Sequence, residues 1–254
     1  MRTMRLAIDS HVHVYPFFSA PRLLEVAHRN LSRCAPTADR YVLCLTERAG
    51  MFAFEALARG DLRATPWTIE ATPDAQVLRA HTADGRSLHI LAGRQIIAAE
   101  RVEVLALGVD LRLDDGLPLR EIIARVRDAG ALPVLPWGLG KWWGQRGRLL
   151  AARLAEAKPG DLALGDTYLL PALAPRPALL RQAAARGFRV LAGTDPLGRP
   201  GEEEIIGRYG VGAVAEFDDA HPAASLLRIL GNPALPLISI GRRGSLVDTL
   251  SRLW

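Results

Sequence analysis

The sequence is poor in cysteine, in aromatic residues and in long apolar runs. Its 254 residues include two cysteines and 6% aromatic residues. Cys34 and Cys44 are too few for a secreted disulfide scaffold, and they lack the Cys-x-x-Cys spacing of a metal or redox site. No apolar run reaches the length of a membrane span, and the stretch before Ile8 is too short for a signal peptide. We therefore expect no membrane partner and a cytoplasmic location.

Neither sign of charge is concentrated in one part of the chain. Lysine and arginine number 32 against 27 acidic residues, which gives a net charge of +5. The basic residues are nearly all arginine and are scattered, as on an ordinary solvated surface. We therefore do not expect nucleic acid as a partner, and a small phosphorylated ligand remains compatible with the charge. The hydrophobic share of 49% supports one folded domain over residues 1–254.

Short apolar runs alternate with amphipathic stretches, which is typical of an α/β fold. Strands are predicted at residues 5–9, 41–46, 102–107, 132–136, 161–164, 189–192, 213–216 and 237–240. Helices are predicted at residues 21–31, 51–59, 119–129, 148–157, 177–186, 202–209, 222–230 and 246–253. Residues 67–91 alternate around a turn and predict a β-hairpin outside the main fold. A closed or nearly closed TIM-like barrel is favoured over an open doubly wound sheet.

The first predicted strand ends in two histidines. His11 and His13 are two residues apart, so on an extended chain both imidazoles point to the same side and can bind one cation. Asp9 precedes them as a residue that orients the pair. Imidazole suits a divalent metal such as zinc, manganese or iron. We do not expect the remaining histidines to be ligands: His28, His81, His89 and His221.

Three carboxylates also follow predicted strands. Asp195 comes after the strand at 189–192, and in a barrel it would face the same mouth as the histidines, as a metal ligand or as a base. The alternative is that Asp195 caps the next helix. Glu47 is a candidate metal ligand and catalytic group, and Asp166 a candidate substrate contact, although each alone is often a cap or a loop residue.

The loop at residues 136–148 combines tryptophans, glycines and basic residues. Trp137 and Lys141 are candidate substrate contacts, as a stacking ring and an anion anchor. The alternative is a lid whose tryptophans pack against the barrel. Arg199, ahead of a predicted helix, is a further candidate for binding phosphate.

With these residues in place, the chain resembles the PHP (polymerase and histidinol phosphatase) family of metal-dependent phosphoesterases. Residues 8–13 look like its first metal motif, residues 45–48 like the next and residues 193–195 like the closing one, and residues 102–108, 118–123 and 128–135 are similar in spacing to its middle section. The resemblance covers most of the chain. It implies a distorted barrel of about seven strands, a cluster of metals and hydrolysis of phosphate esters.

The chain departs from the family pattern at four positions. Gln95 replaces a glutamate, and the other three replace histidines: Glu103, Trp137 and Leu197. The resemblance therefore implies a reduced site of one or two metals on His11, His13, Asp195 and Glu47.

Three other functions remain open. The chain could be a barrel without catalysis that binds a phosphorylated or nucleotide-like ligand. It could also be an amidohydrolase-type enzyme, which shares the opening His-x-His and the closing aspartate. A nucleic-acid-binding module would rest on charge and tryptophans alone.

Overall fold

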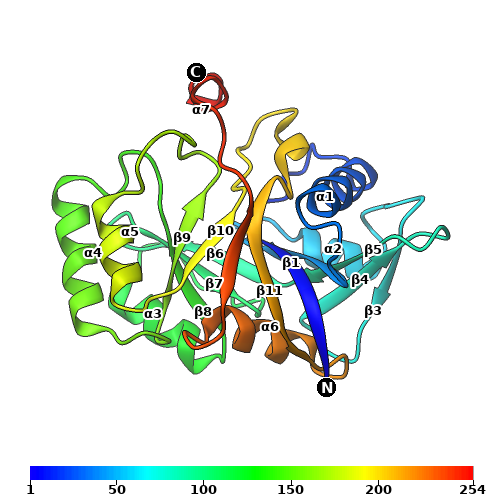
Figure 1. Cartoon of the computed structure of the whole chain (residues 1–254), viewed down its shortest axis with the longest axis horizontal. Coiled ribbons are helices and arrows are strands. Elements are labelled where there is room, and N and C mark those ends of the chain that lie inside the picture. Colours follow the sequence, from blue (N-terminus) through cyan, green and yellow to red (C-terminus); the bar gives the residue numbers. More distant parts are fainter. Residues whose placement is uncertain (254) are drawn as a thin grey trace.

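The computed structural model describes residues 1–253 as a mixed α/β fold. The strands form a seven-stranded and a five-stranded sheet (Figure 1). They are β1 (Arg2–Val12), β2 (Arg40–Leu45), β3 (Thr68–Ala71), β4 (Val77–His81), β5 (Ser87–Leu91), β6 (Gly93–Ile97), β7 (Glu103–Leu107), β8 (Leu132–Pro136), β9 (Ala163–Thr167), β10 (Val190–Gly193), β11 (Tyr209–Phe217) and β12 (Leu237–Gly241). The helices are α1 (Ala20–Cys34), α2 (Ala53–Arg59), α3 (Leu119–Asp128), α4 (Gly144–Glu156), α5 (Ala178–Ala185), α6 (Pro222–Gly231), α7 (Leu246–Leu253) and a 3₁₀ turn, η1 (Glu202–Ile205).

Strand β1 lies inside the larger sheet and carries the first site residues. It runs antiparallel to β11 and parallel to β2, with Ile8 opposite Val42 of β2. Every residue from Leu6 to Val12 is buried. The burial does not alternate because both faces of the strand are covered, Leu6 and Ile8 packing in one core cluster and Ala7 and Val12 in another.

Several helices cover the outer faces of the sheets. Helices α3, α4 and α5 pack on the five-stranded sheet, where Ile122 and Leu150 belong to the same core cluster as Leu135 of β8. Helix α1 lies at the other side of the molecule, beside β1 and β2 (Figure 1). None of the helices within residues 1–253 has the length and apolar composition that crossing a lipid bilayer requires.

The two sheets meet at the carboxyl ends of β1 and β2. The backbone N–H of Asp195, just after β10, donates to the carbonyl oxygen of His11 at 2.8 Å. On the opposite side, the N–H of Glu47 donates to the carbonyl oxygen of Gly93 at 3.0 Å. These contacts are isolated bonds rather than continuous ladders. The α/β class is therefore confirmed, whereas a closed TIM-like barrel is not.

Three parts of the chain differ from the sequence prediction. Residues 67–91 contain the predicted hairpin, β4 and β5, but it belongs to the edge of the larger sheet, because β5 pairs with β2. Residues 202–209 form only the η1 turn before β11 begins, not a helix. Strand β6 was not predicted, and it pairs antiparallel with β7.

The junction of β1 and β10 depends on a glycine. A Cβ atom on Gly193 would lie 2.6 Å from both the N and the Cβ of His11, and backbone cannot yield as a flexible side chain can. We predict that Gly193→Ala lowers the free energy of unfolding by about 2 kcal/mol in chemical denaturation. Gly231→Ala is the matched control, because its Cβ would meet only Leu132 at an ordinary 3.5 Å. Equal stability of both variants would contradict the close approach.

Candidate metal centre

The carboxyl end of β1 places two imidazole rings side by side. His11 and His13 are 3% and 4% exposed, and their ring centroids are 4.9 Å apart. Their spacing of two residues directs both rings to one side of the strand. The Nε2 atom of His11 lies 3.1 Å from the Nε2 atom of His13. The two nitrogens therefore face a common point.

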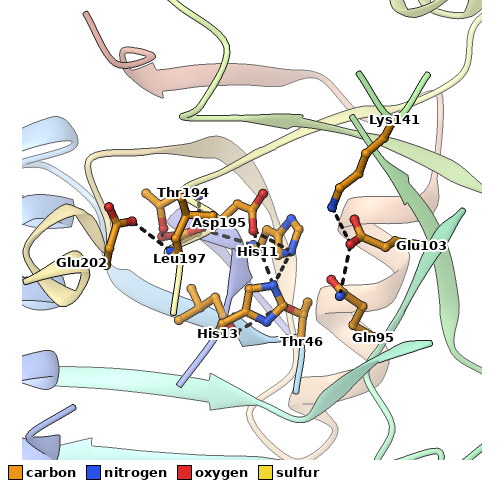
Figure 2. A network of polar contacts seen from close by, with 12 residues as sticks. His11, His13, Thr46, Gln95, Glu103, Lys141, Thr194, Asp195, Leu197 and Glu202 are labelled. Carbon is orange, nitrogen blue, oxygen red and sulfur yellow. Dashed lines mark hydrogen bonds and ion pairs between the residues drawn. The ribbon is translucent and has the colours of Figure 1, made fainter. Parts of the chain in front are cut away.

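Asp195 brings a carboxylate to this point from the loop after β10. Its φ of +50° lies in the left-handed region, which aspartate adopts more readily than most residues. The Oδ1 atom lies 3.4 Å from the Nε2 atoms of both His11 and His13. Figure 2 shows the three side chains converging. The structure thus places Asp195 where the sequence predicted it, beside the two histidines and not at the start of a helix.

The spacing of these three atoms fits one divalent cation. Zinc lies about 2.0–2.1 Å from nitrogen and oxygen ligands, so neighbouring ligands of a tetrahedral site are about 3.3–3.4 Å apart. The observed separations of 3.1, 3.4 and 3.4 Å are close to that value. Within residues 1–253, His11, His13 and Asp195 are the one cluster of three such groups. The donor set fits a transition metal such as zinc.

The charges of the three groups also suit a cation. Burial lowers the pKa of His11 to about 4, so this ring is neutral at pH 7 and has a free lone pair. Burial acts to raise the pKa of Asp195, but His11 and His13 hold that pKa below its usual range. The carboxylate is therefore ionised. A buried anion beside a neutral imidazole is the arrangement that a bound cation stabilises.

Thr46, at the end of β2, orients His13. Its hydroxyl donates to the carbonyl oxygen of Val12 at 3.2 Å and lies 3.4 Å from His13 Nδ1. Because the hydroxyl proton is engaged, Thr46 accepts a hydrogen bond from Nδ1–H. His13 then carries its proton on Nδ1 and leaves Nε2 free as a ligand atom.

Asp9 holds the backbone of the site rather than the imidazole rings. Its carboxylate is fully buried and accepts hydrogen bonds from the N–H of Thr194 at 2.9 Å, the hydroxyl of Thr194 at 2.5 Å and the N–H of Gly207 at 2.9 Å. The N–H of His11 lies 3.3 Å from the same carboxylate. Burial raises the pKa of Asp9 to about 6, although these hydrogen bonds act to lower it. Asp9 thus fixes β1 to the loop that carries Asp195.

A second polar group lies on the other side of His11 from Asp195 (Figure 2). Lys141 Nζ contacts Glu103 Oε1 at 2.5 Å, and Gln95 Nε2 lies 3.4 Å from the same oxygen. The charge of Lys141 lowers the pKa of both His11 and Asp195, which places its ammonium near the cluster. The sequence marked Gln95 and Glu103 only as departures from the family. The contact of Gln95 with Glu103 could not be predicted, because β6 was not.

Glu47 does not join the cluster, which corrects the prediction that it is a ligand and catalytic group. Its Oε1 accepts hydrogen bonds from the N–H groups of Ala53 and Phe54 at the start of α2, at 3.2 Å for Phe54. Its Oε2 lies 3.9 Å from Arg94 Nη1. Glu47 is 2% exposed. It therefore acts as a helix cap with a buried cationic partner, the alternative that its position after a strand left open.

Among the predicted substrate contacts, the prediction that Trp137 stacks against substrate is wrong. It is 5% exposed and packs in the core cluster under α3 and α4, so its ring offers no stacking surface. Asp166 is also buried, and its Oδ2 accepts hydrogen bonds from Arg176 at 3.0 Å and Tyr209 at 2.9 Å. Arg199 is exposed on the loop after β10. Lys141 is thus the candidate whose charge acts on His11 and Asp195.

Comparison with known proteins finds similarity of structure only. No family model matches the chain, and no curated protein matches its sequence. PsfC from Pseudomonas syringae superposes with a TM-score of 0.56 and 16% identity, over 98% of this chain and 95% of PsfC. The lesion-specific endonuclease PfuEndoQ from Pyrococcus furiosus superposes with a TM-score of 0.52 and 12% identity, over 93% of this chain and 58% of PfuEndoQ. Likeness at these identities shows a shared fold alone.

The cluster predicts stoichiometric metal binding. We expect wild type to bind one zinc ion per chain in a calorimetric titration, and Asp195→Asn, which can keep the left-handed backbone, to bind at least about tenfold more weakly. His221→Ala is the control, since that histidine is exposed and pairs with Asp218. Equal zinc affinity in Asp195→Asn and wild type would contradict the assignment.

Proposed function

We propose that the chain is a metal-dependent hydrolase of phosphate esters with a reduced, PHP-like site. The observation that carries this proposal is the convergence of His11 Nε2, His13 Nε2 and Asp195 Oδ1 within 3.4 Å of one another. His11, His13 and Asp195 would hold the metal. Three protein ligands leave a fourth position for water or substrate, as in catalytic rather than structural zinc sites. When bound, the metal would supply Lewis-acid polarisation and a water of lowered pKa.

The protein groups around the cluster have distinct tasks in this proposal. The Oδ2 atom of Asp195 is the carboxylate oxygen not directed at the histidines, and it orients the attacking water by accepting a hydrogen bond from it. Lys141 binds the phosphoryl oxygens of the substrate. Glu103, which Gln95 contacts in turn, holds the Lys141 side chain toward the site. Arg199, on the exposed loop, contacts more distant parts of the substrate.

The fold supports this proposal without deciding the substrate. We propose that residues 1–254 form one domain, in which β1, β2 and β6 to β10 make a distorted seven-stranded barrel with the cluster at its mouth. One structural neighbour is an endonuclease, an enzyme that hydrolyses phosphodiesters. The expectation that nucleic acid is not a partner has no support from that comparison. Phosphodiesters therefore belong among the substrates to be tested.

Turnover distinguishes a hydrolase from a barrel that only binds ligands. We expect zinc- or manganese-loaded wild type to hydrolyse at least one member of a panel of aryl phosphomonoesters, phosphodiesters and oligonucleotides. His13→Ala should lower kcat/KM by at least about a hundredfold, because it removes a ligand and the polarisation that depends on it. His221→Ala should retain the activity of wild type. Metal-loaded protein without turnover on any substrate would favour the binding function.

Lys141 should affect substrate binding more than the chemical step. Lys141→Gln removes the positive charge, and we expect KM for an active phosphate ester to rise about tenfold with a smaller change in kcat. Lys158→Gln is the matched control, because Lys158 is exposed and follows the far end of α4. If Lys141→Gln had the KM of wild type, Lys141 would not be a substrate contact.

A further inference from the structure

A separate cleft lies between the end of α1 and the start of α7. It has a volume of about 860 Å³, within the range of small-molecule binding sites. Four arginines line it, and they come from different parts of the chain: Arg33 from α1, Arg208 from the turn before β11, and Arg242 and Arg243 from the segment after β12. None of the metal-cluster residues lines this cleft.

The positive charge of the cleft is largely uncompensated. Arg33, Arg208 and Arg242 make no ion pair with any carboxylate among residues 1–253, and Arg243 donates instead to the carbonyl oxygen of Ala174 at 3.3 Å. Asp248 is the one acidic residue that lines the cleft. Four guanidinium groups around one hollow repel each other, so an anion bound there would be stabilised electrostatically.

The remaining wall of the cleft is apolar. Tyr168 and Ala172 line it together with Leu173 and Leu246, which are 96% and 57% exposed. An aromatic ring and exposed leucines beside arginines suit a ligand that combines phosphate groups with apolar parts. The cleft is larger than one phosphate requires, and it has more arginines than one phosphate requires.

The cleft also shares a wall with the metal centre. The guanidinium of Arg252, on α7, lies 5.6 Å from the ring centroid of Tyr168 and donates to the carbonyl oxygen of Asp195 at 2.8 Å. Arg252 is held there by Glu202, with Nη2 to Oε2 at 2.7 Å. The two sites are therefore neighbours separated by the Tyr168 and Arg252 side chains.

We propose that this arginine cleft is a second binding site, for an anion that carries several phosphate groups. Arginine binds phosphate through paired N–H donors, and four arginines from three segments match a chain of phosphates better than a single one. A small polyphosphate and the backbone of a single-stranded oligonucleotide share this chemistry. The site does not depend on metal or on turnover at the metal centre.

Arginine substitutions test the cleft directly. Inorganic tripolyphosphate is titrated by calorimetry and a fluorescent single-stranded oligonucleotide by anisotropy, against wild type and the Arg208→Ala/Arg242→Ala double variant. We expect wild type to bind at least one probe, and the double variant to bind that probe at least about tenfold more weakly, because two charge-assisted contacts are lost. Both arginines are exposed, so the thermal unfolding midpoint should stay unchanged.

Two controls separate this site from general charge and from the metal centre. Arg63→Ala/Arg120→Ala removes the same charge from exposed positions that do not line the cleft, and it should bind the probe as wild type does. His13→Ala should also bind it normally, even if that variant has lost metal. Tripolyphosphate binding alone would identify a small ligand, and oligonucleotide binding alone a nucleic-acid strand. Binding of neither probe, or equal loss in both arginine pairs, would overturn the proposal.

Discussion

The candidate site depends on the hydrogen bonds that join the end of β1 to the end of β10. Asp9 accepts two hydrogen bonds from Thr194 and one from Gly207, and the N–H of Asp195 donates to His11. Gly193 allows the two backbones to approach this closely. Asp195 is 182 or more positions away from the two histidines in the sequence. These contacts are what bring the three residues together. The contacts between the two strand ends thus fix the positions from which the three side chains converge.

Burial then determines the chemistry that the cluster can perform. Desolvation keeps His11 neutral, while Asp195 stays ionised beside the rings. These are the protonation states that metal ligands require. The ammonium of Lys141 supplies a positive charge near the cluster, and Glu103 limits its freedom. The structure brings two histidines and one aspartate together, and the reduced site that the family resemblance implies remains part of the proposal.

The sequence predicted the convergence of His11, His13 and Asp195, but it predicted their surroundings poorly. Predicted strands at 5–9 and 189–192 were confirmed, and with them the meeting of His11, His13 and Asp195, because strand ends in an α/β fold gather at one edge. Glu47 was wrong as a ligand because a residue after a strand can equally cap the next helix, here α2. Trp137 was wrong because periodicity does not reveal whether a loop tryptophan packs inward. The pairing of β5 with β2, and β6 itself, depend on long-range contacts that local patterns do not encode.

X-ray absorption at the zinc edge of protein loaded with one zinc ion tests the central claim most directly. The account predicts a first shell of nitrogen and oxygen at about 2.0–2.1 Å, with multiple scattering from two imidazole rings. That signature should fall to one ring in His11→Ala. A spectrum with no imidazole scattering, or with sulfur in the first shell, would contradict a metal centre on His11, His13 and Asp195.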